Sequence, residues 1–360
     1  MTRSTAAGGL PLPRPAVAAL PRYSTAVGAS SVRWRASSNE STVEPSKAIL
    51  QAMDDAAKRV NRYPSLVGDG LATDIAARLG VSRSQVVVGG GSISLLQQAL
   101  SAYTGNGTEV IYSWRSYEAY PILIGIADAT KVPVPLDAEA THDLEAMLRA
   151  ITGRTSAIIV CNPNNPTGTE VSKKGLVDFL DRVPSNVLVL LDEAYREFGA
   201  GEIDGVDLLD RYPNLVVLRT FSKAYGLAGL RAGYLVASEE IAGNVQATAL
   251  PFGLNLIAEA AARAAWADKS HVDQIVETVK SSRRNLRAEL EVRGLKTPVS
   301  GSNFVWIPLT TNTLLLEQYC VEEGVSVRAF NGEGVRVTVG EPLAEEAVLK
   351  AVDRFLQEER

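Results

Sequence analysis

A single lysine stands where a run of apolar residues ends and a glycine-rich stretch begins. The segment "RTFSKAYGLAGLRAGY", Arg219 to Tyr234, places Lys223 directly after Ser222 and adds a second cation at Arg231. A lysine amine can form a Schiff base with an aldehyde, and a lysine whose pKa is lowered by burial or by nearby cations can act as nucleophile and base. The ordinary alternative is that Lys223 is a solvated loop lysine, so the neighbouring segments are needed to distinguish the two interpretations.

Polar residues follow other apolar runs in the same part of the chain. Asp192 follows "NVLVLL", Asn165 lies in the "NPNNPTG" that follows "SAIIVC", and Gly91 and Ser92 lie in the "GGGS" that follows "VVV". Ligands of open α/β sheets bind beyond the carboxyl ends of the strands, so these residues are expected at one site. Each also has an ordinary alternative, because Asp192 could cap a helix and the other two segments could be turns.

Together these residues provide the groups that pyridoxal phosphate requires. The cofactor needs an amine for its aldehyde, a carboxylate at its pyridine nitrogen, donors for its phenolic oxygen and an anion site for its phosphate. Lys223 would supply the amine and Asp192 the carboxylate. The remaining groups would be Asn165 and Tyr195 for the phenolic oxygen, and Gly91, Ser92, Ile93, Ser222 and Arg231 for the phosphate. In the last set, the first three residues would open a helix with free backbone N–H groups.

Short apolar strand candidates alternate with helical stretches between about residues 70 and 240. This alternation predicts an α/β fold with a mainly parallel central sheet, and the continuous Val, Ile and Leu runs predict helices on both faces. The chain then reads as helical from about 254 to 293, with Gly294 as its cap, before shorter strands and a last helix that indicate a smaller α+β domain. We expect a large cofactor-binding domain over 46–248, and a second unit formed by the N-terminal arm, 1–45, with 249–360.

These motifs resemble those of the fold-type I pyridoxal-phosphate aminotransferases. "NPNNPTG", "DEAY" and "SKAYGLAGLRAGY" occur in the order and spacing of the histidinol-phosphate aminotransferase subgroup, and the resemblance covers nearly the whole chain. It implies the cofactor roles already given for Lys223, Asp192 and their neighbours. It also implies that Trp114 stacks on the cofactor ring. Tyr63 is implied to reach the cofactor phosphate of the neighbouring subunit in a homodimer with shared sites.

The substrate side of the site is expected to depend on residues near both ends of the chain. In "GVRVTVG" the alternation places Arg336 and Thr338 on one face of a strand, where an arginine can hold a carboxylate with two hydrogen bonds. The resemblance implies that Arg336 binds the substrate carboxylate and that Asn39 lies in an arm that covers the substrate. It leaves open whether Arg328 and Tyr23 bind a distal phosphate, as in the histidinol-phosphate enzymes.

Three segments depart from the histidinol-phosphate pattern. "GGGSIS", "SNEST" and "SWRSYEAYP" resemble instead the bacterial aromatic amino acid (phenylalanine) aminotransferases. We therefore expect ping-pong transfer of an amino group from phenylalanine or tyrosine to 2-oxoglutarate, with histidinol-phosphate aminotransferase as the alternative. Lyase or oxoamine-synthase chemistry remains open on the same scaffold. A cofactor-sensing transcription regulator is disfavoured, because only about 45 irregular residues precede the fold.

Composition narrows the remaining function classes. A chain of 360 residues that is 46% hydrophobic can bury a large core, and its net charge of −5 leaves no basic stripe for nucleic acid. No apolar run approaches the length of a membrane span. The only cysteines, Cys161 and Cys320, and the only histidines, His142 and His271, are too sparse for a disulfide framework or a metal site. We expect a cytoplasmic protein without a metal, whose N-terminal segment is an irregular arm and not a signal peptide.

Overall fold

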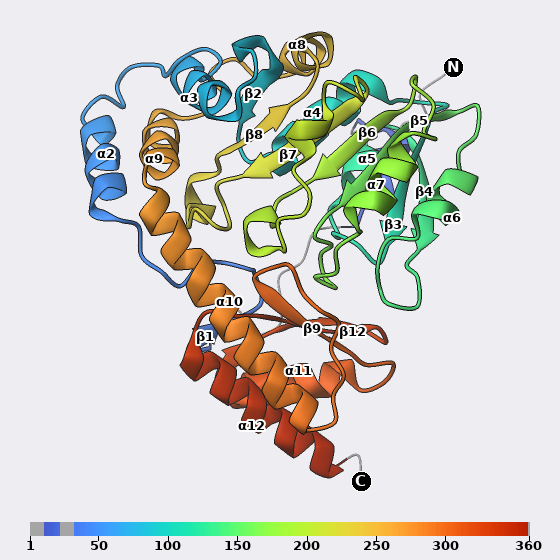
Figure 1. Ribbon diagram of the computed structural model, residues 1–360, viewed down its shortest axis with the longest axis vertical. Helices are drawn as coiled ribbons and strands as arrows, with labels where there is room; N and C mark the ends of the chain where they lie inside the picture. Colours follow the sequence, from blue (N-terminus) through green and yellow to red (C-terminus); the bar gives the residue numbers. More distant parts are fainter. Residues whose placement is uncertain (1–10, 22–31, 359–360) are drawn as a thin grey trace.

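A seven-stranded sheet lies at the centre of the computed structural model, which describes residues 11–21 and 32–358 (Figure 1). Its strands, in spatial order, are β2 (Val86–Gly89), β8 (Gly233–Val236), β7 (Leu215–Thr220), β6 (Leu188–Asp192), β5 (Thr155–Cys161), β3 (Glu109–Trp114) and β4 (Thr130–Pro135). Neighbouring strands are parallel except in the two pairs that contain β8. The mainly parallel α/β sheet predicted from the sequence is confirmed.

Helices cover both faces of this sheet because its strands bury side chains on alternate sides. In β5, Ala157 and Ile159 belong to one buried cluster, whereas Ile158 and Val160 belong to another. The first cluster includes side chains of α4 (Ser92–Tyr103), α5 (Tyr120–Ile126) and α8 (Glu239–Ala247). The second includes side chains of α2 (Lys47–Ala57), α3 (Asp69–Leu79), α6 (Leu144–Arg149), α7 (Lys173–Leu180) and α9 (Leu256–Ala267).

The long helix α10 (Lys269–Val292) leads from this layered part to a smaller one (Figure 1). The expected helical region is interrupted at Asp268, whose carboxylate caps α10 by accepting a hydrogen bond from the His271 backbone N–H. Gly294 follows α10 with φ of +84°, a conformation that suits glycine at a helix end. The smaller part contains the antiparallel sheet β11 (Arg328–Phe330), β12 (Gly334–Thr338) and β9 (Phe304–Pro308), with helices α11 (Thr313–Glu322) and α12 (Pro342–Glu358).

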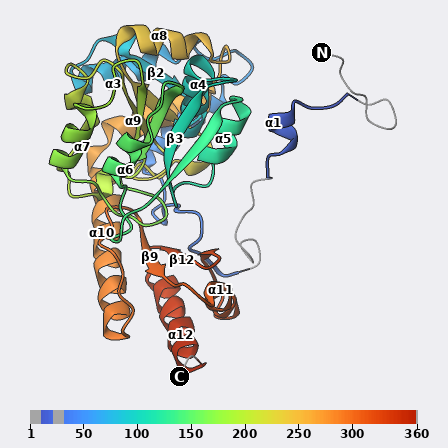
Figure 2. The same cartoon turned by 90° about the vertical axis from the view of Figure 1, so that its right-hand side faces the viewer.

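The segment that begins at residue 32 joins the smaller part before the chain enters the sheet. Its strand β1 (Trp34–Arg35) pairs in parallel with β10 (Val325–Ser326). In Figure 2, α10 and α12 extend on the same side of the central sheet, and the two helices are in contact. Helix α9, which lies beyond residue 248, packs against α2 and α3 of the layered part. The division of the chain at residue 248 stays a prediction.

Residues 11–21 form a separate described stretch that contacts α5. Their short helix α1 (Pro15–Ala18) lies beside α5, and the Arg14 guanidinium donates a hydrogen bond to the Ile126 carbonyl oxygen at 2.7 Å. The prediction for Tyr23 falls outside the described residues. Loops elsewhere contain the short 3-10 helices η1 (Arg83–Gln85), η2 (Arg196–Phe198), η3 (Gly205–Leu208) and η4 (Ala228–Leu230). None of the helices in the described ranges has the length and apolar character needed to cross a membrane.

Candidate active site

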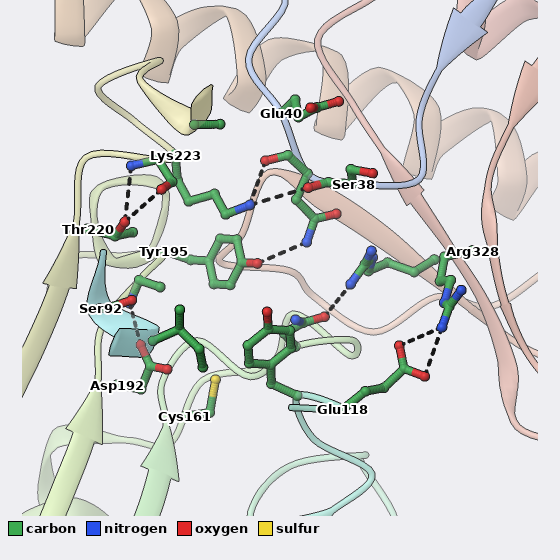
Figure 3. Close-up of a pocket in the computed structure, with 18 of the residues that line it drawn as sticks. Ser38, Glu40, Ser92, Glu118, Cys161, Asp192, Tyr195, Thr220, Lys223 and Arg328 are labelled. Carbon is green, nitrogen blue, oxygen red and sulfur yellow. Dashed lines mark hydrogen bonds and ion pairs between the residues drawn. The ribbon is translucent and has the colours of Figure 1, made fainter. Parts of the chain in front are cut away.

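The ends of several strands meet at one edge of the central sheet and form the floor of a cavity. Because β8 runs antiparallel to its neighbours, its first residue lies beside the last residues of β2 and β7. The cavity has a volume of about 310 Å³ and is bounded by this edge, by the segment that precedes α2 and by β11 and β12 (Figure 3). Of the predicted site residues, the cavity wall contains Asn39, Ser92, Ile93, Asn165, Asp192, Tyr195, Ser222, Lys223, Arg231, Arg328 and Arg336.

Lys223 follows β7 and extends its amine into this cavity (Figure 3). The amine donates hydrogen bonds to the backbone carbonyl oxygens of Asn39, at 2.9 Å, and Ser38, at 3.3 Å. Burial lowers the pKa of Lys223 to about 7, and the positive charges of Arg336 and Arg231 act in the same direction. A large fraction of the Lys223 amine is therefore neutral near pH 7, as a nucleophile or a general base must be.

Asp192 ends β6 and is buried below the amine. Its carboxylate accepts a hydrogen bond from the Tyr120 hydroxyl at 2.7 Å and another from the Ala194 backbone N–H at 3.2 Å. Burial raises the pKa of Asp192 to about 6, while the bond from Tyr120 acts to lower it. Tyr120 was not predicted as a site residue, although it lies in the quoted segment "SWRSYEAYP".

Two more predicted residues are hydrogen-bonded across the cavity, Tyr195 to the segment that precedes α2 and Asn165 to the strand β12. The Asn39 amide donates to the Tyr195 hydroxyl at 2.9 Å. Arg336 donates to the Asn165 side-chain oxygen at 2.5 Å and to the backbone carbonyl of Ser37. Because a guanidinium can only donate, the contact with Asn165 orients that amide with its oxygen toward Arg336. Burial raises the pKa of Tyr195, so its hydroxyl remains a proton donor.

The predicted polar face of β12 is confirmed by a second contact with the N-terminal segment. The Thr338 hydroxyl donates to the Asn39 side-chain oxygen and accepts from the Asn39 backbone N–H, both at 3.0 Å. Arg336 and Thr338 therefore both face the segment around Asn39, which belongs to the expected covering arm. This arrangement holds Asn39 against the Lys223 amine.

A guanidinium, a hydroxyl and a helix N-terminus lie together on the floor of the cavity and make a candidate anion site. Arg231 donates to the Ser222 hydroxyl at 3.0 Å and to the Ala228 carbonyl at 2.9 Å. Ser92 begins the helix α4, and Gly91 precedes it with φ of +90°. Glycine suits this conformation, and a Cβ at Gly91 would lie 2.9 Å from Arg231 Nη2, so a larger residue there would displace the guanidinium. Backbone N–H groups at a helix start and an arginine are the usual ligands of a phosphate.

The structure corrects the prediction for Trp114. This side chain is absent from the cavity wall, and Arg115 lies 4.1 Å above its ring. The indole packs edge-on against Tyr112, with ring centroids 6.0 Å apart. Tyr117 of the same segment lines the cavity instead, because the chain turns after β3 and brings the later aromatic residue inward. The aromatic residues of this segment in the cavity wall are therefore Tyr117 and Tyr120, and not Trp114.

Tyr63 lies outside the cavity of its own chain. It occupies the loop between α2 and α3, has 81% of its surface exposed and stacks on Phe252 with ring centroids 4.7 Å apart. The predicted reach of Tyr63 into a neighbouring subunit's site stays a prediction.

An ion pair occupies the end of the cavity away from the strand ends (Figure 3). Arg328 Nη2 lies 3.0 Å from each carboxylate oxygen of Glu118, a residue that was not singled out from the sequence. Arg328, for which the sequence left open a role with Tyr23 in binding a distal phosphate, is thus held by an acidic side chain. Nearby, Arg115 pairs with Glu333 through a hydrogen bond of 2.7 Å from Nε. Within the described part of the chain, no cluster of His, Cys, Asp and Glu is suited to a metal ion.

Residues 36–355 match the family model described as aminotransferase class I and II. The chain belongs to this family. An aromatic amino acid aminotransferase from Streptomyces avermitilis is 47% identical over 92% of this chain and 93% of its own length. One from Thermobifida fusca is 45% identical over 94% and 96%. A histidinol-phosphate aminotransferase from Sinorhizobium meliloti, solved in complex with pyridoxal 5'-phosphate, has a TM-score of 0.85 at 26% identity and covers 91% of this chain and 92% of its own.

The protein is therefore an enzyme of the pyridoxal-phosphate-dependent aminotransferases, and the family, fold and cofactor expected from the sequence motifs are confirmed.

Proposed function

We propose that this aminotransferase moves an amino group from an aromatic amino acid, phenylalanine or tyrosine, to 2-oxoglutarate. For the reaction type, the observation with most weight is the convergence of a partly buried amine with a lowered pKa, a buried carboxylate and a candidate anion site on one cavity of about 310 Å³. For the substrate, support comes from relatives at 45–47% identity that are named aromatic amino acid aminotransferases.

The cavity residues fit pyridoxal phosphate. Arg231, Ser222 and the start of α4 would hold the phosphate, since the guanidinium donates to the Ser222 hydroxyl and lies beside Gly91, where α4 begins. Asp192 would hold the pyridine nitrogen, and Tyr195 with Asn165 the phenolic oxygen. Lys223 would carry the aldehyde carbon covalently. When bound, the cofactor supplies an electrophilic carbon for the amino group and a ring that accepts electrons from the substrate Cα.

Lys223 is the residue suited to move the proton that the transfer requires. With a pKa of about 7, the amine can accept a proton from the substrate Cα and then donate it to a different atom. The carbonyl oxygens of Asn39 and Ser38 restrict where that amine lies. Asp192, with a pKa of about 6, is mainly ionised at pH 7 and can stabilise a protonated ring nitrogen.

Arg336 would bind the α-carboxylate common to the amino acid and the oxo acid. It lies on the cavity face of β12, and its contacts with Asn165 and the Ser37 carbonyl fix its direction. Ile93 and Tyr117 add apolar surface to the same wall. Transfer of an aromatic ring into such surroundings gains on the order of 1.5–3 kcal/mol.

A comparison of amino donors tests this proposal. We expect kcat/KM for phenylalanine or tyrosine with 2-oxoglutarate to exceed that for histidinol phosphate. The alternative, a histidinol-phosphate aminotransferase, is kept because Arg328 is a cation of the cavity wall and because a solved structure of that activity shares the fold. A preference of tenfold or more for histidinol phosphate would replace the aromatic assignment by this alternative.

We also propose that the active form is a homodimer with shared sites. Apolar side chains are exposed together near Tyr63: Leu66 is 55% exposed, Leu250 78% and Phe252 39%. Exposed apolar surface of this kind commonly marks an interface between proteins. In the dimer, Tyr63 would contact the cofactor phosphate of the partner. A cytoplasmic location is proposed as well, supported by the unpaired, buried thiols of Cys161 and Cys320.

A further inference from the structure

Two arginines on neighbouring strands lie side by side in the cavity wall. Arg328 of β11 is paired directly opposite Arg336 of β12, so both side chains emerge on the same face of the sheet, and both line the cavity. Side chains in directly opposed positions have Cβ atoms about 5 Å apart, and like charges in such positions destabilise a sheet. An anion is therefore expected beside at least one of them.

Glu118 provides that anion beside Arg328. Its carboxylate accepts from Arg328 Nη2 with both oxygens at 3.0 Å, whereas the contacts of Arg336 include the neutral oxygens of Asn165 and Ser37. The Glu118 and Arg328 side chains are only 28% and 15% exposed. Solvent consequently screens the pair incompletely, and separating it would leave two poorly hydrated charges.

We infer that Glu118 determines substrate specificity: it neutralises Arg328 and so excludes phosphate monoesters from the distal end of the cavity in favour of uncharged side chains. This inference rests on the proposed aminotransferase function and names the feature that would select its donor. A phosphate dianion at Arg328 would face the Glu118 carboxylate or would have to displace it. An uncharged aromatic ring is not repelled by the Glu118 carboxylate and does not have to displace it, because the ion pair can remain intact beside the ring.

A purely structural role for Glu118 is the competing explanation, since it ties the loop after β3 to β11. The structure contains a matched pair with that same structural effect. Arg115 and Glu333 connect the same loop to the turn that follows β11, and neither residue lines the cavity. Loss of the Glu333 carboxylate should loosen the two segments in the same way without changing the charge beside Arg328.

The donor half-reaction of the holoenzyme tests the inference. Without an oxo acid present, cofactor absorbance gives the apparent second-order rate constant for histidinol phosphate and for phenylalanine. The ratio of the two constants is compared in the wild-type protein, Glu118→Gln, Glu333→Gln and the double variant Glu118→Gln/Arg328→Met. Glu118→Gln keeps the shape of the side chain and removes its charge. Glu118→Ser serves if the glutamine variant does not fold.

We expect Glu118→Gln to raise the ratio of histidinol phosphate to phenylalanine at least about tenfold, which corresponds to about 1.4 kcal/mol. The ratio should change less than threefold in Glu333→Gln, and the gain should disappear in the double variant because the freed cation is gone. A rise below tenfold in Glu118→Gln, an equal rise in Glu333→Gln or a gain that persists without Arg328 would each overturn the inference. The preference of the wild-type protein tests the proposed function separately, since the effect of Glu118 is read only from the change in ratio.

Discussion

Lys223 and Asp192 show how burial can prepare an amine and an acid for different tasks at one pH. Burial favours the neutral form of each group, lowering the pKa of the lysine to about 7 and raising that of the aspartate to about 6. Near pH 7 the lysine is therefore partly neutral, while the aspartate is mainly charged. The hydroxyl of Tyr120 supports this by donating to the Asp192 carboxylate.

The pKa of Lys223 can be measured in the apoenzyme. Trace labelling with acetic anhydride across a pH series, followed by mass spectrometry of the Lys223 peptide, should give a midpoint near 7 rather than near 10.4, the usual lysine value. Arg336→Met should raise the midpoint, because it removes a positive charge that disfavours protonation of the amine. A wild-type midpoint close to that of solvated lysines would contradict the assigned environment.

Asp192 and Tyr120 should affect turnover to different degrees. Asp192→Asn is expected to keep the fold and to lose at least about 10²–10³ in kcat, because it removes a fixed charge at the ring nitrogen. Tyr120→Phe should cost less. It should also move the acid limb of the kcat profile to higher pH, since loss of the hydrogen bond raises the pKa of Asp192. A near-normal kcat in Asp192→Asn would instead indicate that Asp192 has only a capping role.

At the scale of elements, the anion site depends on how closely α4 and β8 approach. A Cβ at Gly233, the first residue of β8, would lie 2.5 Å from the Ser92 backbone nitrogen, and one at Gly91 would meet Arg231. These two glycines let the start of the helix lie against the strand that follows Arg231.

Gly91→Ala should weaken pyridoxal phosphate binding at least about tenfold, because the methyl group displaces Arg231 and the backbone conformation is unfavourable for alanine. A titration of apoenzyme by cofactor-dependent fluorescence quenching measures the Kd. Gly243→Ala in α8 is the control, since a Cβ there meets no atom within 4 Å. The control should leave the Kd unchanged and stabilise the fold by about 0.5–1 kcal/mol. Equal affinities in the two variants would argue against the crowding at Gly91.

The elements and much of the cofactor side of the cavity were predictable from sequence, for a physical reason. Strands that are buried on both faces have continuous apolar sequences, which can be recognised directly. The residues at or after the ends of these strands, such as Asp192 and Lys223, lie at the edge of the sheet where ligands bind. Tyr117, Glu118 and Tyr120 were missed because their roles depend on the path of the loop after β3. Their partners lie far away in sequence, as Arg328 does from Glu118, and no local periodicity reports such contacts.

For the molecule as a whole, the exposed position of Tyr63 gives the dimer proposal a direct test. Tyr63→Ala and Lys223→Ala protomers, each inactive alone, should regenerate activity when mixed, because one site of the hybrid dimer contains both native residues. Activity is measured after subunit exchange has been demonstrated with differently tagged chains. An absence of recovery despite exchange and inactive parents would indicate that Tyr63 serves its own subunit.

The reversed direction of β8 has a consequence for inheritance. Because β7 and β8 pair side by side, with Thr220 opposite Gly233, both Lys223 and Arg231 lie on the short segment that connects them. Recombination between related genes would therefore transfer these two residues together on one stretch of sequence. Arg328 and Arg336 lie about 100 residues later in the chain and could be inherited from a different parent gene. The two residues that we propose to attach the cofactor and to hold its phosphate would therefore be inherited together.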